Sequence, residues 1–451
     1  MSHAPPDLPG AMLTDSPIDR ALTLLLADEV EAALRWSAAV VERDASIPSA
    51  LVITSRLLQL MGRSEAAING LDLAIRRAID AGNLPLAIAA AADLRRLGAP
   101  VGPQIEQIAG AFCLGSPRLQ ETETPPPPLQ RFDAFQPLSS FLTGPALTSK
   151  AAQILHAASR EYDEASETEM PLVAPLPFFS ALTKEALAEL VLAFEMTTVP
   201  SGARVISEGE EGAEAYIVAR GELEVSRRDG SDDGSIVLAR LVSGALFGEM
   251  ALLSRAPRAA TVIATRPSIL LVAKREALET VAEKRPEIAV ELAAHCRRRM
   301  VANLAKTSPV LIAVPAGERS TLVERFETKI FEKGDKLVVE GRETKGLHLI
   351  ASGEVAVVAH EKGESVVVAT LSTGQTVGEV ALVLRRKANA DVIAVHPTVT
   401  LFLPREDFLQ LVSDHPAILH GLYMSAVRRD DETMRALDSA PASVVDDYLL
   451  L

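Results

Sequence analysis

Hydrophobic side chains recur every three or four positions over the first quarter of the chain. Leu, Ala and Ile supply most of them, and Ser16 followed by Pro17 provides a capping residue and a proline at the first helical position. A Glu-Ala-Ala triplet at residues 31–33 returns at residues 65–67, 34 positions later. We therefore expect a domain of short α-helical hairpins over residues 15–118.

A proline-rich segment interrupts this helical pattern. Residues 125–128 are four consecutive prolines, which can neither continue a helix nor lie in a central strand. We interpret them as a semi-rigid spacer rather than as a ligand of an SH3-like domain. Residues 119–172 are therefore predicted to be a Pro-rich linker that contains one helix, from Ser149 to Glu164.

From residue 175 the pattern changes to short segments of alternating hydrophobic and polar residues that end at glycines. Such alternation is typical of strands with one buried face. Helical periodicity flanks these segments at Lys184–Phe194 and Lys274–Asn303, which predicts a β-barrel bracketed by helices. The expected strands are Ala215–Ala219, Gly221–Val225, Ile236–Leu241, Thr261–Ala264 and Ser268–Val272.

The strand pattern occurs twice. The Gly-Glu pair at residues 221–222 returns 132 residues later at 353–354, and the pair at 248–249 returns 130 residues later at 378–379. Two landmarks in register over a hundred residues indicate two copies of one domain. The predicted fold class is multidomain α+β: N-terminal helical hairpins, then two β-barrel (jelly-roll) domains flanked by helices. We place these domains at residues 173–305 and 306–438.

Charge and composition narrow the function classes. Among 451 residues, 45 are Lys or Arg and 60 are Asp or Glu, which gives a net charge of −15. A chain this acidic is a poor general ligand for nucleic acid, and a helix-turn-helix is not expected after the repeated domains. The longest apolar run is about half of the ~20 residues that a membrane span requires. Without a signal-peptide pattern and with two distant cysteines, Cys113 and Cys296, we expect a cytoplasmic protein with reduced thiols.

The first copy carries, between Phe247 and Val262, the groups that a cyclic nucleotide requires. A cyclic phosphate bears one negative charge, which a guanidinium stabilises well, and the ribose 2′-hydroxyl needs an acceptor such as a carboxylate. A glycine lets the backbone approach the ligand without an intervening Cβ. Here Gly248 and Glu249 open a short helix, and Arg258 follows nine residues after Glu249 at the head of a strand.

This segment resembles the phosphate-binding cassette of cyclic-nucleotide-binding domains, as in protein kinase A regulatory subunits and bacterial catabolite activator proteins. The resemblance extends over the whole domain, from residue 176 to the trailing helices. It implies that Arg258 pairs with the phosphate, that Glu249 holds the 2′-hydroxyl, and that the backbone of residues 259–260 offers amides. The ligand-binding residues implied are Phe247, Gly248, Glu249, Met250, Ala251, Arg258, Ala259 and Ala260.

The base preference follows from the same resemblance. In this family a threonine directly after the arginine favours cGMP, because its hydroxyl can bond to the guanine. This chain has Ala259 at that position. The resemblance therefore implies cAMP as the ligand, with weaker binding of cGMP.

The second copy departs from the cassette pattern. Gly378, Glu379 and Ala381 are retained, but Ala388 stands where the first copy has Arg258, and Asp391 replaces a nearby threonine. Losing a charged hydrogen-bonding partner in a desolvated site costs about 2–5 kcal/mol. We expect this second site to be empty or to bind something else. The basic residues 385–387 just upstream are interpreted as a solvated loop.

Several functions remain open at this point. The 34-residue period in the helical region resembles that of tetratricopeptide-type hairpins, but plain helical hairpins of no named family account for it about as well. No metal-ligand spacing, P-loop or Gly-x-Ser-x-Gly motif suggests an enzyme. We predict a regulatory adaptor that senses cAMP and binds a protein partner through its N-terminal helices, with the arginines at 297–299 as a candidate relay. The alternatives are a scaffold that binds no nucleotide and a kinase inhibitor, whose candidate Arg-Arg segments start at Arg76 and Arg95.

Overall fold

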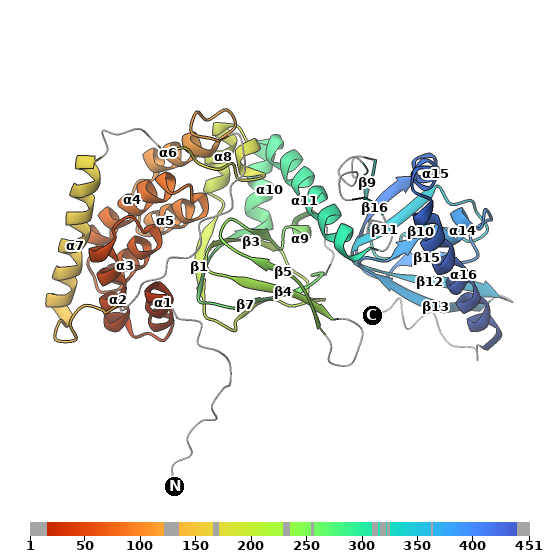
Figure 1. The fold of residues 1–451 in the computed structure, drawn as a ribbon, viewed down its shortest axis with the longest axis horizontal. Coiled ribbons are helices and arrows are strands. Elements are labelled where there is room, and N and C mark those ends of the chain that lie inside the picture. The colour runs from red at the N-terminus through yellow and green to blue at the C-terminus, as the bar shows by residue number, and fades with distance from the viewer. Residues whose placement is uncertain are drawn as a thin grey trace, which may run out of the picture.

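The computed structural model describes three regions that follow one another along the molecule: helices, a first β domain and a second β domain (Figure 1). The predicted proline spacer at residues 125–128 and both chain ends lie outside the described residues. Those described are 16–120, 135–165, 171–228, 235–253, 257–308, 314–315, 322, 325–361 and 364–439.

The N-terminal region is helical, as predicted. From α1 to α6 each helix packs on its neighbour in the sequence, and positive-φ glycines such as Gly62 and Gly82 follow helix ends, where other residues would be strained. The tetratricopeptide likeness of this region stays a prediction. Its helices are α1 (Pro17–Leu26), α2 (Val30–Arg43), α3 (Pro48–Leu60), α4 (Ser64–Asp80), α5 (Leu84–Arg96), α6 (Gly102–Phe112) and α7 (Gly144–Ala165).

Helix α7 contains the helix that was predicted within the linker range, and it returns to the helical region. It packs against α2, α3 and α4 (Figure 1). The contact is close: a Cβ on Gly70 of α4 would lie 2.2 Å from the Ser55 hydroxyl and 2.7 Å from a methyl of Leu155. Glycine at position 70 therefore lets α3, α4 and α7 meet. The predicted limits of the linker and of the domains stay predictions.

The first β domain is a sandwich of two four-stranded antiparallel sheets. Their strand orders are β1-β8-β3-β6 and β2-β7-β4-β5. The jelly-roll type predicted is therefore confirmed, but the sheets do not close into a barrel. The strands are β1 (Glu195–Val199), β2 (Arg204–Ile206), β3 (Glu214–Arg220), β4 (Leu223–Arg228), β5 (Ser235–Leu241), β6 (Leu246–Phe247), β7 (Thr261–Ala264) and β8 (Ser268–Lys274).

The second β domain repeats this topology strand for strand, with orders β14-β11-β16-β9 and β10-β15-β12-β13. The duplication inferred from the Gly-Glu landmarks is thus visible in the fold. Its strands are β9 (Glu327–Phe331), β10 (Lys336–Val338), β11 (Gly346–Ser352), β12 (Glu354–Glu361), β13 (Glu364–Ser372), β14 (Thr376–Val377), β15 (Asp391–Ala394) and β16 (Thr398–Pro404).

Helices pack against strands of each sandwich. The helical stretch predicted at Lys274–Asn303 is two helices, because Pro286 lacks the amide needed to continue the first one. The helices of the two domains include η1 (Phe179–Ala181), α8 (Lys184–Val191), α10 (Arg275–Lys284), α11 (Pro286–Thr307), α15 (Arg405–Asp414) and α16 (Pro416–Ser439).

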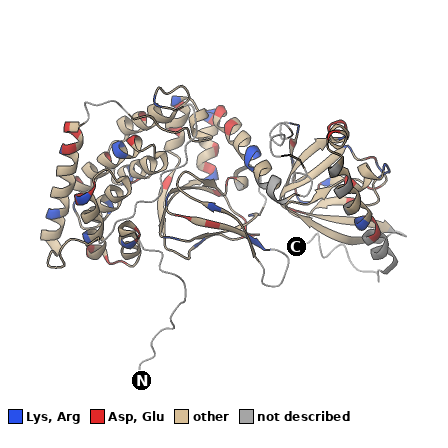
Figure 2. Ribbon diagram, in the orientation of Figure 1, with Lys and Arg blue, Asp and Glu red and all other residues tan. Residues whose placement is uncertain are grey.

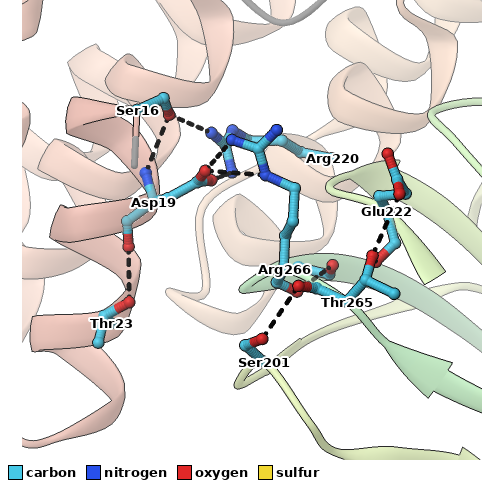
Figure 3. A network of polar contacts seen from close by, with 9 residues as sticks. Ser16, Asp19, Thr23, Ser201, Arg220, Glu222, Thr265 and Arg266 are labelled. Atoms are coloured by element: carbon cyan, nitrogen blue, oxygen red, sulfur yellow. Dashed lines mark hydrogen bonds and ion pairs between the residues drawn. The ribbon is translucent and has the colours of Figure 1, made fainter. Parts of the chain in front are cut away.

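The helical region is docked directly on the first β domain. One continuous hydrophobic cluster runs from α1 to strands β3 and β8, and α5 packs on the sheet that contains β1, β3 and β8. A buried ion-pair cluster lies beside it, where Asp19 of α1 faces both Arg220 and Arg266 (Figure 3). The Arg220 Nη1 atom is 2.7 Å from Asp19 Oδ1. Helices and first β domain therefore form one packed body.

Candidate functional site

The cassette of the first domain lies between β6 and β7. Phe247 ends β6 and stacks on Tyr216, with ring centroids 5.2 Å apart. Gly248 follows with φ of 75°, a conformation that L side chains rarely adopt, and turns the chain into the short helix α9 (Met250–Leu253). The sequence prediction of a glycine-led turn into a short helix is met here.

Arg258 projects into this turn. Its side chain is buried, and its Nη1 and Nη2 atoms donate to the backbone carbonyls of Gly248 (2.8 Å) and Glu214 (2.9 Å). The Glu214 carboxylate is 4.0 Å away. Burial lowers the pKa of Arg258 from its ordinary value, while Tyr216 and nearby carboxylates oppose that shift. The guanidinium is thus a desolvated cation held by neutral carbonyl groups.

Gly212 makes room for that guanidinium. A Cβ at position 212 would lie 2.3 Å from both Nε and Nη2 of Arg258. A Cβ on Gly248 would likewise lie 2.8 Å from Nη1. Sequence reasoning found Gly248 but missed Gly212, because a single glycine in a loop carries no sign of the side chain that it accommodates.

Glu249, the predicted ribose acceptor, is only 4% exposed. Its Oε1 atom forms an ion pair with Arg299 Nη1 of α11, at 3.4 Å. Burial raises the pKa of Glu249, and the charge of Arg299 opposes that rise. Within the arginine run, Arg297 and Arg298 are exposed, whereas Arg299 connects the cassette to the helix that leads into the second domain.

The other predicted cassette residues lie in the same segment as Glu249 and Arg258. Met250 packs against the hydrophobic cluster that contains Cys296 and Met300 of α11. Ala259 and Ala260 directly precede β7, next to Arg258. Ala251 lies in α9, and its side chain is outside the described part of the structure. The structure therefore brings the predicted backbone positions into one turn, while the ligand-binding role of each residue stays a prediction.

The second domain has the same turn without the arginine. Gly378 has φ of 93°, and the buried carboxylate of Glu379 pairs with Arg429 of α16. Ala388 stands where the first domain has Arg258. The basic residues 385–387 are exposed, and Arg386 pairs with Asp430, in accord with a solvated loop. Sequence analysis missed Arg429, which lies 50 residues beyond its partner.

No group of His, Cys, Asp or Glu in the described part of the chain could hold a metal ion. None of the described helices is long and apolar enough to cross a membrane. Cys113 and Cys296 are both free and buried. Basic and acidic residues are interspersed over the helices and strands (Figure 2).

Comparisons with known proteins agree with this geometry. The model of the cyclic nucleotide-binding domain family matches residues 196–285 and 328–415. The chain is 32% identical to a cAMP-dependent protein kinase regulatory subunit of Yarrowia lipolytica, over 52% of this chain and 60% of the relative. It is 26% identical to cGMP-dependent protein kinase 2 of mouse, over 57% of this chain and 33% of that protein.

Among solved structures, the regulatory domain of Toxoplasma gondii protein kinase A with cAMP is similar at 26% identity. The match covers 56% of this chain and 92% of that one, with a TM-score of 0.28. The chain spans 60% of the length of the Yarrowia lipolytica relative and 33% of the mouse kinase, and the helical region lies outside the family match. Together with the duplicated sandwich and the glycine-led cassette, the match of the family model at residues 196–285 and 328–415 identifies both β domains as members of the cyclic nucleotide-binding domain family.

Proposed function

We propose that the chain is a non-enzymatic, cytoplasmic regulatory adaptor that binds one cAMP in its first β domain and conveys its presence to a protein partner. The observation that carries this proposal is the buried guanidinium of Arg258. The hydrogen bonds found for its side chain use two of its five N–H groups, both to backbone carbonyls. The remaining donors can meet an anionic phosphate within a desolvated pocket, where charge-assisted bonds are strong.

The choice of cAMP rests on the residue after the arginine. Ala259 lacks the hydroxyl that would favour guanine under the family rule. The relative from Yarrowia lipolytica is named as cAMP-dependent, which supports the same choice. We expect cGMP to bind the same site more weakly.

The route from ligand to partner starts at Glu249. A ribose hydroxyl that donates to this carboxylate competes with Arg299, and so changes the contact between the cassette and α11. Helix α11 leads into the second domain, whose core cluster includes residues of this helix. A ligand shifts such an equilibrium only by its differential affinity for the two arrangements, typically about 1–3 kcal/mol.

We propose that the protein partner binds to the helical region. This region packs on the sheet that includes β3 and β6, and β6 ends at Phe247 of the cassette. The kinase-inhibitor alternative is less well supported. Arg76 and Arg77 lie within α4, with their guanidinium carbons 4.8 and 4.7 Å from the ring centre of Tyr162, and Arg95 donates to the carbonyls of Leu192 and Phe194.

Titration calorimetry of the full chain with cAMP and with cGMP tests this proposal. We expect one cAMP per chain and a weaker cGMP isotherm. Two equal cAMP sites would contradict the assignment to the first domain alone. Absence of binding would favour the scaffold alternative, in which neither domain takes up nucleotide.

A further inference from the structure

The second β domain contains a cavity of about 70 Å³ beside its glycine-led turn. The cavity is partly open to solvent, and its walls are mainly apolar, formed by Val338, Val357, Leu371 and Val392. Thr344 and Glu379 supply polar atoms to its lining. At about 10–15 Å³ for each water molecule, this space holds about five waters, which is enough for a sugar ring.

This cavity is remodelled relative to the first domain at two matched positions. Ala388 replaces Arg258: its carbonyl accepts from Gly341, just as the carbonyl of Arg258 accepts from Gly209. Thr344 replaces Gly212. A Cβ on Gly378 would lie 2.8 Å from the Thr344 methyl, the same distance that separates the corresponding Cβ on Gly248 from Arg258 Nη1. A methyl group therefore occupies the place of the guanidinium.

A charged residue next to the lining also differs between the two domains. Asp391, between the lining residues Ala390 and Val392 in the sequence, stands where the first domain has Thr261, and it is buried. Its Oδ2 atom is 2.5 Å from Lys336 Nζ, and its Oδ1 accepts from the Glu340 amide at 2.7 Å. The lysine is thus paired with a carboxylate. The arginine of the lining, Arg429, pairs with Glu379 and donates to the carbonyl of Thr376, so it does not take the place of Arg258. A phosphate would lose its charged partner here.

Two buried polar atoms of the lining lack partners. Glu379 is 1% exposed, and one of its oxygens pairs with Arg429 while Oε2 has no hydrogen-bond partner in the described residues. The same holds for Oγ1 of Thr344, a residue that is 6% exposed. Leaving a buried polar atom unsatisfied costs about 1–3 kcal/mol. A ligand with adjacent hydroxyl groups would satisfy these atoms.

We propose that the second domain binds an uncharged nucleoside rather than a cyclic nucleotide. The ribose hydroxyls bond to Glu379 and Thr344, and the base lies along the apolar walls toward the open side. Ala388 and Thr344 exclude the phosphate by removing its cation and filling its place. The proposal for the second domain does not depend on whether the first domain binds cAMP.

The test uses the full chain with Arg258→Ala, so that the first domain contributes little binding. Adenosine, guanosine and uridine are titrated by calorimetry, with 2′-deoxyadenosine, AMP and cAMP for comparison. We expect one nucleoside per chain, and 2′-deoxyadenosine, AMP and cAMP each weaker by about tenfold or more than adenosine. If no nucleoside binds, the cavity holds water only and the proposal fails. Equal binding of cAMP and adenosine would also overturn it.

Variants locate the site. Glu379→Gln is expected to weaken nucleoside binding by about tenfold. Glu379→Gln also breaks a buried ion pair and so lowers stability as well as binding. Ala388→Leu is therefore a second variant, which fills the cavity without removing a charge. It should abolish binding while the protein still unfolds cooperatively, and Lys387→Ala, on the exposed loop, is the matched control. Thr344→Gly with Ala388→Arg should lower nucleoside binding and raise that of cAMP. Unchanged nucleoside binding in Ala388→Leu would place the ligand elsewhere.

Discussion

The guanidinium of Arg258 occupies the space that a side chain at Gly212 would need, because a Cβ at position 212 would lie 2.3 Å from it. We expect Gly212→Thr to displace Arg258 and to weaken cAMP binding by about a hundredfold, because a buried charged partner contributes about 2–5 kcal/mol. Titration calorimetry measures the change. Gly102→Thr is the control, since a Cβ there meets nothing within 4 Å. Wild-type affinity in Gly212→Thr would show that the arginine does not hold the ligand.

Arg258→Ala separates ligand binding from stability. Removing this buried cation leaves no buried carboxylate stranded, and water can replace the guanidinium at the two carbonyls that it now bonds. Arg258→Ala should therefore shift the melting temperature of the ligand-free protein little while weakening cAMP binding by about a hundredfold or more. Differential scanning fluorimetry with and without cAMP reports both effects. Arg240→Ala, whose side chain is 68% exposed, should change neither. A steep fall in the ligand-free melting temperature of Arg258→Ala would mean that the arginine is structural.

Sequence patterns predicted the cassette because its residues are close in the chain. Gly248, Glu249 and Arg258 lie within eleven positions. The five strands expected in this domain lie within about three residues of their predicted bounds, whereas β1, β2 and β6 were not expected. The missed partners are distant in sequence. Arg299 follows Glu249 by 50 positions, as Arg429 follows Glu379, and neither spacing belongs to a helix or strand period.

The docking of the helices on the first β domain could not be predicted for the same reason. It rests on Asp19 and Arg220, which are 201 positions apart, and each residue alone is an ordinary surface charge in the sequence. The division of the long helix after β8 could have been predicted, since Pro286 is visible in the sequence and cannot continue a helix.

Asp19 stabilises the contact between the helical region and the first β domain. Asp19→Ala leaves the buried guanidinium of Arg220 without its carboxylate, and breaking a buried pair in this way costs about 3–5 kcal/mol. We expect a corresponding loss in the free energy of unfolding, measured by urea denaturation. Asp163→Ala is the control: its ion pair with Arg76 is exposed, and such pairs contribute about 0–1 kcal/mol. Equal losses in the two variants would refute this role.

His348 makes the second domain sensitive to acid. It is buried beside Phe331 and Phe402, and burial lowers the pKa of His348 from 6.5 to about 4, with Lys329 adding to the shift. Between pH 6.5 and 4, His348 therefore binds a proton in the unfolded chain but not in the folded chain. Stability is fully present above pH 6.5 and falls as the pH drops toward 4.

The expected loss from this histidine is about 2 kcal/mol between pH 7.5 and pH 5. His348→Gln, which retains a group able to hydrogen-bond to Thr400, should reduce the loss by that amount. Urea unfolding at the two pH values measures it. Burial also lowers the pKa of His295 to about 4, and this residue contributes equally to both proteins. If wild type and His348→Gln lose the same stability, the histidine is not the source.

Hydrogen exchange of the full chain with and without cAMP tests the sensor account most directly. If the ligand competes with Arg299 for Glu249, protection should change in three places: residues 247–253 and 257–262, helices α10 and α11, and the segment around Thr373, whose carbonyl accepts from Arg227 of the first domain. Arg299→Ala should retain the first change and lose the other two. A response confined to the cassette in the wild-type protein would contradict the account, because cAMP would then be a static ligand.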